Sequence, residues 1–289
     1  MSLTTIRYRI SHTTKITYDA PVAASHNEVR MTPLTESGQT ALENRIRVKP
    51  MTWSHVYRDY WGTHVTSLEA LEPHRLLEVE SNSTVERTLI PDVSERLTWA
   101  DYELETLKDS YDEYLSPSAR THLEPEVQRE FRDAVAGMSP GEAVATICAL
   151  VNERMTYMSG STSVGGGAQT AWDARQGVCQ DFTHVTLAAL RIVKIPARYV
   201  SGYLCPKQDL NVGETATGES HSWVEWWAGH WTGRRPHQPP RGRPRPRRRG
   251  PRPRLRRRPP DEGRLPGPLR LQAHRRRLLH PPGVTGRAI

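Results

Sequence analysis

Apolar and polar residues alternate over the first ninety positions of the chain, which is the pattern of half-buried β-strands. The alternating runs are short and closely spaced, and their apolar members are Ile6, Tyr8 and Ile10, then Ile16 and Tyr18, Ile46 and Val48, and Leu77, Val79 and Val85. Residues 59–63, Asp-Tyr-Trp-Gly-Thr, predict a turn between two of these strands. We therefore predict a small all-β domain over residues 1–91, either a sandwich or a barrel.

The pattern changes to a helical period beyond residue 92. Val127, Phe131, Ala134 and Val135 are spaced so that they fall on one face of a helix. The preceding segment, residues 115–118, has the composition of a turn. We assign residues 92–138 to a helical connector between two compact units.

A second compact unit is predicted over residues 139–233. Its first helix has a complete start signal, because Ser139 can cap it, Pro140 suits the first helical position and Glu142 completes a capping box. A Ser/Gly-rich loop at residues 159–169 leads to a second helix that begins near Cys179. Two strands follow, at residues 195–203 and 221–227. Helices followed by antiparallel strands indicate an α+β fold.

A thiol and an imidazole stand at the beginnings of two of these elements. Cys179 lies at a helix N-terminus, where the partial positive charge of the helix dipole stabilises a thiolate. His221 opens a strand, and a nearby histidine can take the proton of a thiol. Taken singly, each residue has a simpler explanation, as a small buried side chain or an ordinary strand histidine. The sequence around them favours the catalytic interpretation.

Three blocks of sequence carry a specific resemblance. Residues 177–182 read Gly-Val-Cys-Gln-Asp-Phe, residues 195–203 read Ile-Pro-Ala-Arg-Tyr-Val-Ser-Gly-Tyr, and residues 220–225 read Ser-His-Ser-Trp-Val-Glu. In order and spacing they resemble the bacterial transglutaminase-like cysteine peptidase family. Residues 8–10 and 59–62 resemble the bacterial transglutaminase N-terminal domain that accompanies this core. Together the resemblance covers about residues 5–233.

The resemblance implies a papain-like α+β core with a Cys-His-Asp triad. Cys179 would be the nucleophile, and His221 the general base and then the general acid. The expected reaction is acyl transfer from a peptide or isopeptide amide of a protein or peptide substrate, through a thioester on the cysteine. Water as the acceptor gives hydrolysis, and an amine gives cross-linking.

The sequence departs from the family pattern at the third member of the triad. The family has an Asp-Pro-Thr-Asn segment shortly after the histidine strand, whereas Gly233 is followed by arginine and proline, and the next acid is Asp261. Residues 235–239 can be encoded by CGA CCC CAC CAA CCN, which read one base later gives Asp-Pro-Thr-Asn. We therefore interpret the C-terminal segment as the product of a frameshift near Gly233. Glu219 and Glu225 are poor substitutes, because one precedes the strand and the other lies four residues along it.

Charge is divided sharply along the chain. Residues 234–289 hold 19 arginines and two acids, a formal charge of +17, whereas the rest holds 21 Lys and Arg against 30 Asp and Glu, a charge of −9. The Arg/Pro-rich segment also lacks Lys, Ser, Asn and every aromatic residue, as expected of a GC-rich gene read out of frame. We predict a disordered tail over residues 234–289 that binds polyanions without specificity.

Length and composition limit the remaining possibilities. With 289 residues, of which 36% are hydrophobic, the chain is long enough for about two domains. No apolar run is long enough to span a membrane, the first residues lack the apolar core of a signal peptide, and three cysteines make no disulfide framework. We expect a cytoplasmic protein.

Other residues carry no further chemistry in this interpretation. Cys148 and Cys205 are expected to pack, and His184 to be structural. Cys179, His184 and His221 lack the spacing of a zinc site, so neither a metal nor a cofactor is expected. The alternative to an enzyme is a catalytically inactive family member, or a protein that binds polyanions through its basic tail. Nothing in the sequence indicates the oligomeric state.

Overall fold

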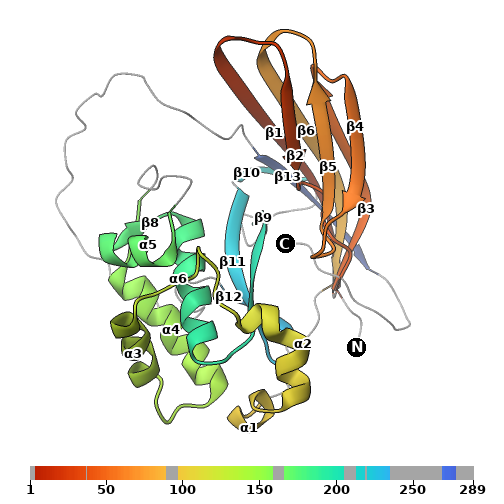
Figure 1. The fold of residues 1–289 in the computed structure, drawn as a ribbon. Coiled ribbons are helices and arrows are strands. Elements are labelled where there is room, and N and C mark those ends of the chain that lie inside the picture. The colour runs from red at the N-terminus through yellow and green to blue at the C-terminus, as the bar shows by residue number, and fades with distance from the viewer. Residues whose placement is uncertain are drawn as a thin grey trace, which may run out of the picture. The chain divides into compact units, whose positions relative to one another are not determined.

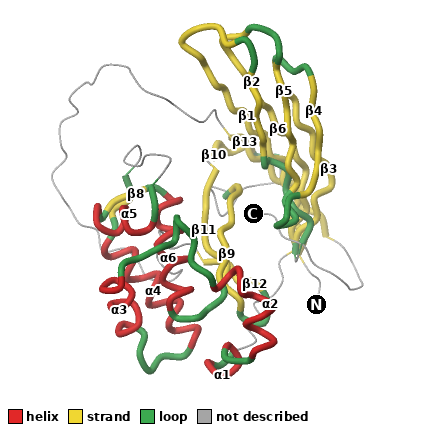
Figure 2. Tube along the Cα trace, in the orientation of Figure 1, coloured by secondary structure: helices red, strands yellow, loops and turns green. Residues whose placement is uncertain are grey.

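The computed structural model describes residues 4–36, 38–88, 97–158, 166–204, 213–218, 220–234 and 269–277. The chain forms two compact units (Figures 1 and 2). The first, here called the β unit, comprises Met1–Pro91, Gly202–Ser220 and Pro253–Ile289, and the second, the α+β unit, comprises Asp92–Ser201 and His221–Arg252. No helix of the described part is long and apolar enough to cross a membrane.

Two β-sheets make up the β unit. A five-stranded sheet has the order β10-β13-β1-β6-β3, with β1 Thr4–Val22, β3 Gln39–Lys49, β6 His74–Thr88, β10 Thr215–Gly218 and β13 Leu269–Arg277. A three-stranded sheet has the order β2-β5-β4, with β2 Ser25–Val29, β4 Trp53–Arg58 and β5 His64–Ala70. Every described pairing in both sheets is antiparallel.

The apolar faces of the two sheets share one core. Val48, Leu77 and Val79 from the larger sheet pack in one cluster with Leu68 and Ala70 from the smaller sheet. Side chains of β6 alternate between buried and less buried along most of its length, as a strand with one face on a core requires. The predicted N-terminal β domain is thus confirmed, in its sandwich form.

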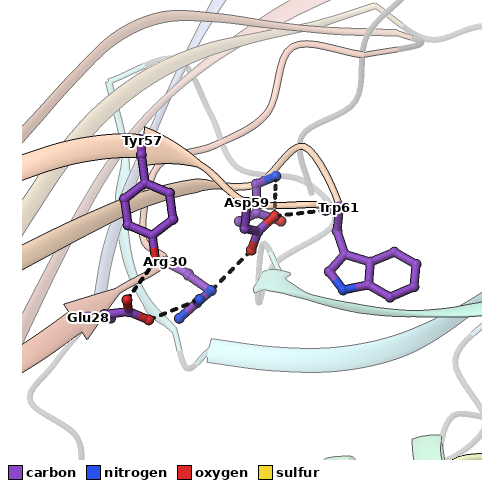
Figure 3. Close-up of polar contacts among 6 residues, drawn as sticks. Glu28, Arg30, Tyr57, Asp59 and Trp61 are labelled. Carbon is purple, nitrogen blue, oxygen red and sulfur yellow. Dashed lines mark hydrogen bonds and ion pairs between the residues drawn. The ribbon is translucent and has the colours of Figure 1, made fainter.

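The predicted turn at residues 59–63 joins β4 to β5 and is built around one carboxylate (Figure 3). Asp59 Oδ1 accepts hydrogen bonds from the backbone N–H groups of Trp61, at 3.0 Å, and Thr63, at 2.9 Å. Gly62 has a φ of 77°, in the left-handed region that favours glycine. The turn therefore follows from its aspartate and its glycine.

A polar network on the smaller sheet extends from this turn (Figure 3). Arg30 lies between two carboxylates, with its Nη2 3.1 Å from Glu28 Oε2 and its Nε 3.4 Å from Asp59 Oδ2. Tyr57 on β4 donates its hydroxyl hydrogen to Glu28 Oε1 on β2, at 2.6 Å. Hydrogen bonds from Tyr57 and Arg30 lower the pKa of Glu28. The two outer strands are therefore joined by side chains across β5.

One strand lies within the segment that we predicted to be disordered. Leu269–Arg277 forms β13 and pairs with β1 from Thr4↔Arg277 to His12↔Leu269. Here the structure differs from the prediction, and residues 269–273 show why, since leucine and alanine alternate with polar residues as in a strand. The rest of the predicted tail beyond Arg234 lies outside the described residues.

The described part of the α+β unit begins with helices α1 to α4. The short strands β7 and β8 then alternate with helices α5 and α6, and three further strands follow. The helices are α1 Trp99–Tyr102, α2 Glu105–Leu115, α3 Pro125–Ala134, α4 Pro140–Arg154, α5 Ala168–Ala174 and α6 Cys179–Ile192. A sheet of order β12-β11-β9 consists of β9 Ala197–Tyr203, β11 Ser220–Trp227 and β12 Trp231–Arg234, and a parallel pair consists of β7 Thr156–Tyr157 and β8 Gln176–Gly177.

Helix α6 lies at the centre of the unit and is buried over ten consecutive residues, from Asp181 to Leu190. The core around it includes residues of α1, α3, α4, α5 and β11 (Figure 1). Tyr102 and Phe131 are among its largest buried side chains, so the helices of the predicted connector, residues 92–138, pack within this unit. The predicted capping box at Ser139 is present, because Glu142 accepts from both its N–H and its hydroxyl.

Candidate active site

A tight turn presents Cys179 as the first residue of α6. The backbone N–H of Val178 donates to Asp181 Oδ2 at 2.7 Å, and Asp181 is only 1% exposed. Gly177 makes room for this carboxylate, because a Cβ there would lie 2.5 Å from Asp181 Cβ and 2.6 Å from its Oδ2. Asp181 therefore caps the first turn of α6.

One turn further along α6, Thr183 joins the helix to β11. Its hydroxyl donates to the carbonyl oxygen of Cys179 at 2.7 Å, and its Oγ1 lies 3.2 Å from Ser222 Oγ. Both hydroxyls are buried. Because Ser222 follows His221 directly, this contact holds the beginning of β11 against the first turn of α6. The structure thus places the two residues predicted from sequence, Cys179 and His221, at adjoining ends of these elements.

Side chains of β11 divide between two faces. Ser222, Val224 and Trp226 face α6, because Val224 and Trp226 belong to the core around α6 and Ser222 contacts Thr183. Tyr199 of β9 reaches the α6 face, where its hydroxyl hydrogen-bonds to Ser222. Burial, and to a lesser extent the nearby thiol of Cys179, raises the pKa of Tyr199, so its hydroxyl is protonated at neutral pH.

Glu225 is committed to a different partner. It is 2% exposed and accepts from Arg198 at 2.7 Å (Nη2) and 3.0 Å (Nε). The same guanidinium lies over the ring of Trp231, 4.5 Å from its centroid. A buried carboxylate held by an arginine is costly to redirect, which agrees with the expectation that Glu225 is a poor substitute for the triad aspartate.

The described pairs between β12 and β11 stop short of His221. They run from Trp227↔Trp231 to Val224↔Arg234. At Gly233, opposite Glu225, a Cβ would be in ordinary contact with Trp223 and Glu225. The described chain therefore brings no residue of β12 opposite His221.

Other residues predicted from sequence are placed as follows. Cys148 packs against the core of the α+β unit, as expected. Cys205, Glu219 and Asp261 lie outside the described residues. Trp223 and Trp226 are buried.

Sequence reasoning missed two residues that interact with each other near α6, Tyr199 and Arg120. Tyr199 stood inside a quoted block of the resemblance, but its strand pattern alone did not say which side chain it would meet. Arg120, whose charge acts on both Tyr199 and His184, lies in a turn far away in the sequence and carried no local signal.

Comparison with known proteins agrees with this architecture. Residues 8–86 match the bacterial transglutaminase-like N-terminal region, and residues 129–234 match the transglutaminase-like superfamily. A Mycobacterium leprae protein described as uncharacterized is 41% identical over 226 residues, which are 78% of this chain and 81% of the relative. A Mycobacterium tuberculosis protein, also described as uncharacterized, is 29% identical over 245 residues, 80% of this chain and 76% of the relative.

Among solved structures, a proposed cysteine protease from Cytophaga hutchinsonii has a TM-score of 0.65 at 21% identity, covering 82% of this chain and 78% of that one. This likeness shows the fold: a β-rich N-terminal region followed by a papain-like core. The chain belongs to the transglutaminase-like superfamily and carries the bacterial transglutaminase-like N-terminal region.

Proposed function

We propose that the α+β unit is the core of a cysteine peptidase or amidase, with Cys179 as nucleophile and His221 as general base, and that activity in this chain is impaired. The observation that carries the proposal is the Thr183–Ser222 contact, which joins the first turn of α6 to the beginning of β11. A cysteine at a helix N-terminus beside a histidine is the arrangement that generates a reactive thiolate.

The bond-making and bond-breaking steps involve these two side chains and water. His221 takes the proton of the Cys179 thiol, and the sulfur attacks the amide carbonyl carbon. The C–N bond breaks, the amine leaves with a proton from His221, and the acyl group remains as a thioester. Water, deprotonated by the same imidazole, then attacks the thioester and releases the carboxylic acid and the thiol.

The missing third group explains the proposed impairment. In a serine protease, replacing the corresponding aspartate lowers kcat by about 10⁴, because the histidine then adopts the wrong tautomer. The alternative reading frame places its aspartate at position 235, directly after the last residue of β12.

Amidase assays of both reading frames test the proposal. We expect the present chain to hydrolyse peptide amides barely above background, and the frame-restored chain to be faster by orders of magnitude. Cys179→Ala in the restored chain should abolish turnover, while Cys148→Ala, the matched control, should leave it unchanged.

Cysteine labelling separates a reactive thiol from a working triad. In the folded chain, iodoacetamide should modify Cys179 at neutral pH faster than Cys148 or Cys205. Equal labelling of all three cysteines would show that Cys179 is not an activated nucleophile. A restored chain that labels selectively but does not turn over any amide would favour the alternative, an inactive family member.

A further inference from the structure

A cavity of about 370 Å³ runs along α6 within the α+β unit. Gln180, His184, Leu187 and Arg191 line it from a single face of the helix, since they are spaced by four, three and four residues. Arg120, in the turn after α2, and Tyr199, on β9, line it from outside the helix. Its volume is in the range of small-molecule sites in proteins.

Two of the lining residues, Gln180 and Tyr199, are neighbours of the candidate nucleophile. Gln180 follows Cys179 directly, and Tyr199 is close enough for the charge of the thiolate to affect its hydroxyl. His184 lies five residues beyond Cys179, about 7.5 Å along the helix at ~1.5 Å per residue.

Arg191 gives the cavity wall a cation that no described carboxylate neutralises. Its Nη1 donates to the carbonyl oxygen of Ser116 at 2.7 Å, and its Nη2 to that of Ala197 at 3.1 Å, both neutral acceptors. Its buried Nε has no hydrogen-bond partner in the described part of the chain. Burial lowers the pKa of this guanidinium, as expected for a charge without a counter-ion.

His184 supplies an unused polar atom in the middle of the cavity wall. The residue is only 7% exposed, and its Nδ1 has no hydrogen-bond partner among the described residues. Burial and then the charge of Arg120 lower its pKa, against a smaller opposing effect of Asp181. The imidazole is therefore neutral at neutral pH, and a buried nitrogen of this kind calls for a partner.

We propose that this cavity is a subsite that binds a carboxylate of the substrate, so that peptides with Asp or Glu next to the scissile amide are preferred. The carboxylate would pair with Arg120 and accept from His184 and Tyr199, while Leu187 covers the methylene groups. That the bound carboxylate belongs to a substrate depends on the proposed peptidase function. The carboxylate site itself rests only on the two guanidinium groups, the imidazole and the phenol.

Binding of glutarate to the full chain tests the site without any turnover. Glutaramide is the matched ligand, equal in shape but uncharged. Because the C-terminal segment also carries arginines, binding should be followed by NMR at the His184 ring. We expect glutarate to shift the ring signals in a saturable manner and glutaramide to leave them unchanged.

Two variants complete the test. Arg120→Gln, at an exposed residue, should weaken glutarate binding at least tenfold, and Arg120→Lys should restore part of it. Arg129→Gln, on an exposed position of α3 outside the cavity, should have no effect. Equal responses to glutarate and glutaramide, or unchanged affinity in Arg120→Gln, overturn the inference even if the restored chain proves to be an amidase. Specific glutarate binding, together with a frame-restored chain that has no amidase activity, would sustain the site and refute the proposed function.

Discussion

At the scale of single residues, the candidate nucleophile is positioned by neighbours that carry no chemistry of their own. Gly177 has no Cβ to displace the Asp181 carboxylate, and that carboxylate holds the Val178 N–H at the start of α6. The sequence showed that this glycine precedes the cysteine, but not that it packs against Asp181. Contacts of this kind depend on how the chain turns, which a residue pattern does not specify.

Gly177→Ala should therefore disturb the turn that presents Cys179. The added methyl group forces Asp181 away from Val178, and we expect a loss of roughly 1–3 kcal/mol in the free energy of unfolding, as for other overpacked sites. Alkylation of Cys179 should also slow. Thermal unfolding and iodoacetamide labelling measure the two effects.

Gly141→Ala is the control for this prediction. An added Cβ at Gly141 meets nothing within 4 Å, and the residue lies in the first turn of α4. Alanine there should leave stability unchanged or raise it slightly. If both variants unfold at the same temperature, the close approach at Gly177 has no energetic importance.

At the scale of secondary-structure elements, the sequence predicted what has a local cause. Alternation indicated the strands of the sandwich, and the Ser139–Glu142 pair indicated the beginning of α4. The sequence did not predict which elements pack against one another. An amphipathic pattern shows that the helix bearing Phe131 buries one face, but not that this face joins the core around α6.

The network between β2 and β4 gives a pH-dependent prediction. Hydrogen bonds from Tyr57 and Arg30 lower the pKa of Glu28 below its usual 4.5, so the ionised carboxylate favours the folded state. This stabilisation is complete above the unfolded-state pKa and is lost as the pH falls through the folded-state value. Tyr57→Phe should raise the pKa of Glu28, which NMR titration of its carboxyl carbon measures.

The same variant should also change the pH dependence of stability. It should be less stable than the parent chain at neutral pH, by an amount that shrinks as the carboxylate becomes protonated. A Glu28 titration that is identical in the two proteins would mean that the Tyr57 hydroxyl does not hold this carboxylate in solution.

At the scale of the whole molecule, the division of charge is the dominant feature. Residues 234–289 carry +17 and the remainder −9. We expect the chain to bind DNA and RNA without sequence preference, with an affinity that falls steeply as salt rises, because binding releases counter-ions. Titration of a labelled duplex at several salt concentrations measures this slope.

Two variants locate the binding. Replacing the arginines between residues 241 and 258 by glutamine should remove most of the salt dependence while leaving β13 in place. Truncation after Gly233 should abolish binding altogether. Nucleic-acid binding that survives in the truncated chain would place the site in the acidic body and contradict the electrostatic account.

The sequence anticipated the overall organisation because its family blocks span most of the chain, from the β domain to the histidine strand. It did not anticipate β13, since a tail dominated by arginine and proline suggested disorder as a whole. The short alternating run at residues 269–273 forms a strand by pairing with the edge of β1, which is far away in the sequence.

The order of strands in the larger sheet also determines which of its pairings can form early during synthesis. A ribosome releases β1, β3 and β6 within the first 88 residues, whereas β10 and β13 emerge only after residue 214. Until then, one side of β1 has no strand of its own chain to meet. Nascent chains are thus exposed to strand exchange with one another for most of their elongation.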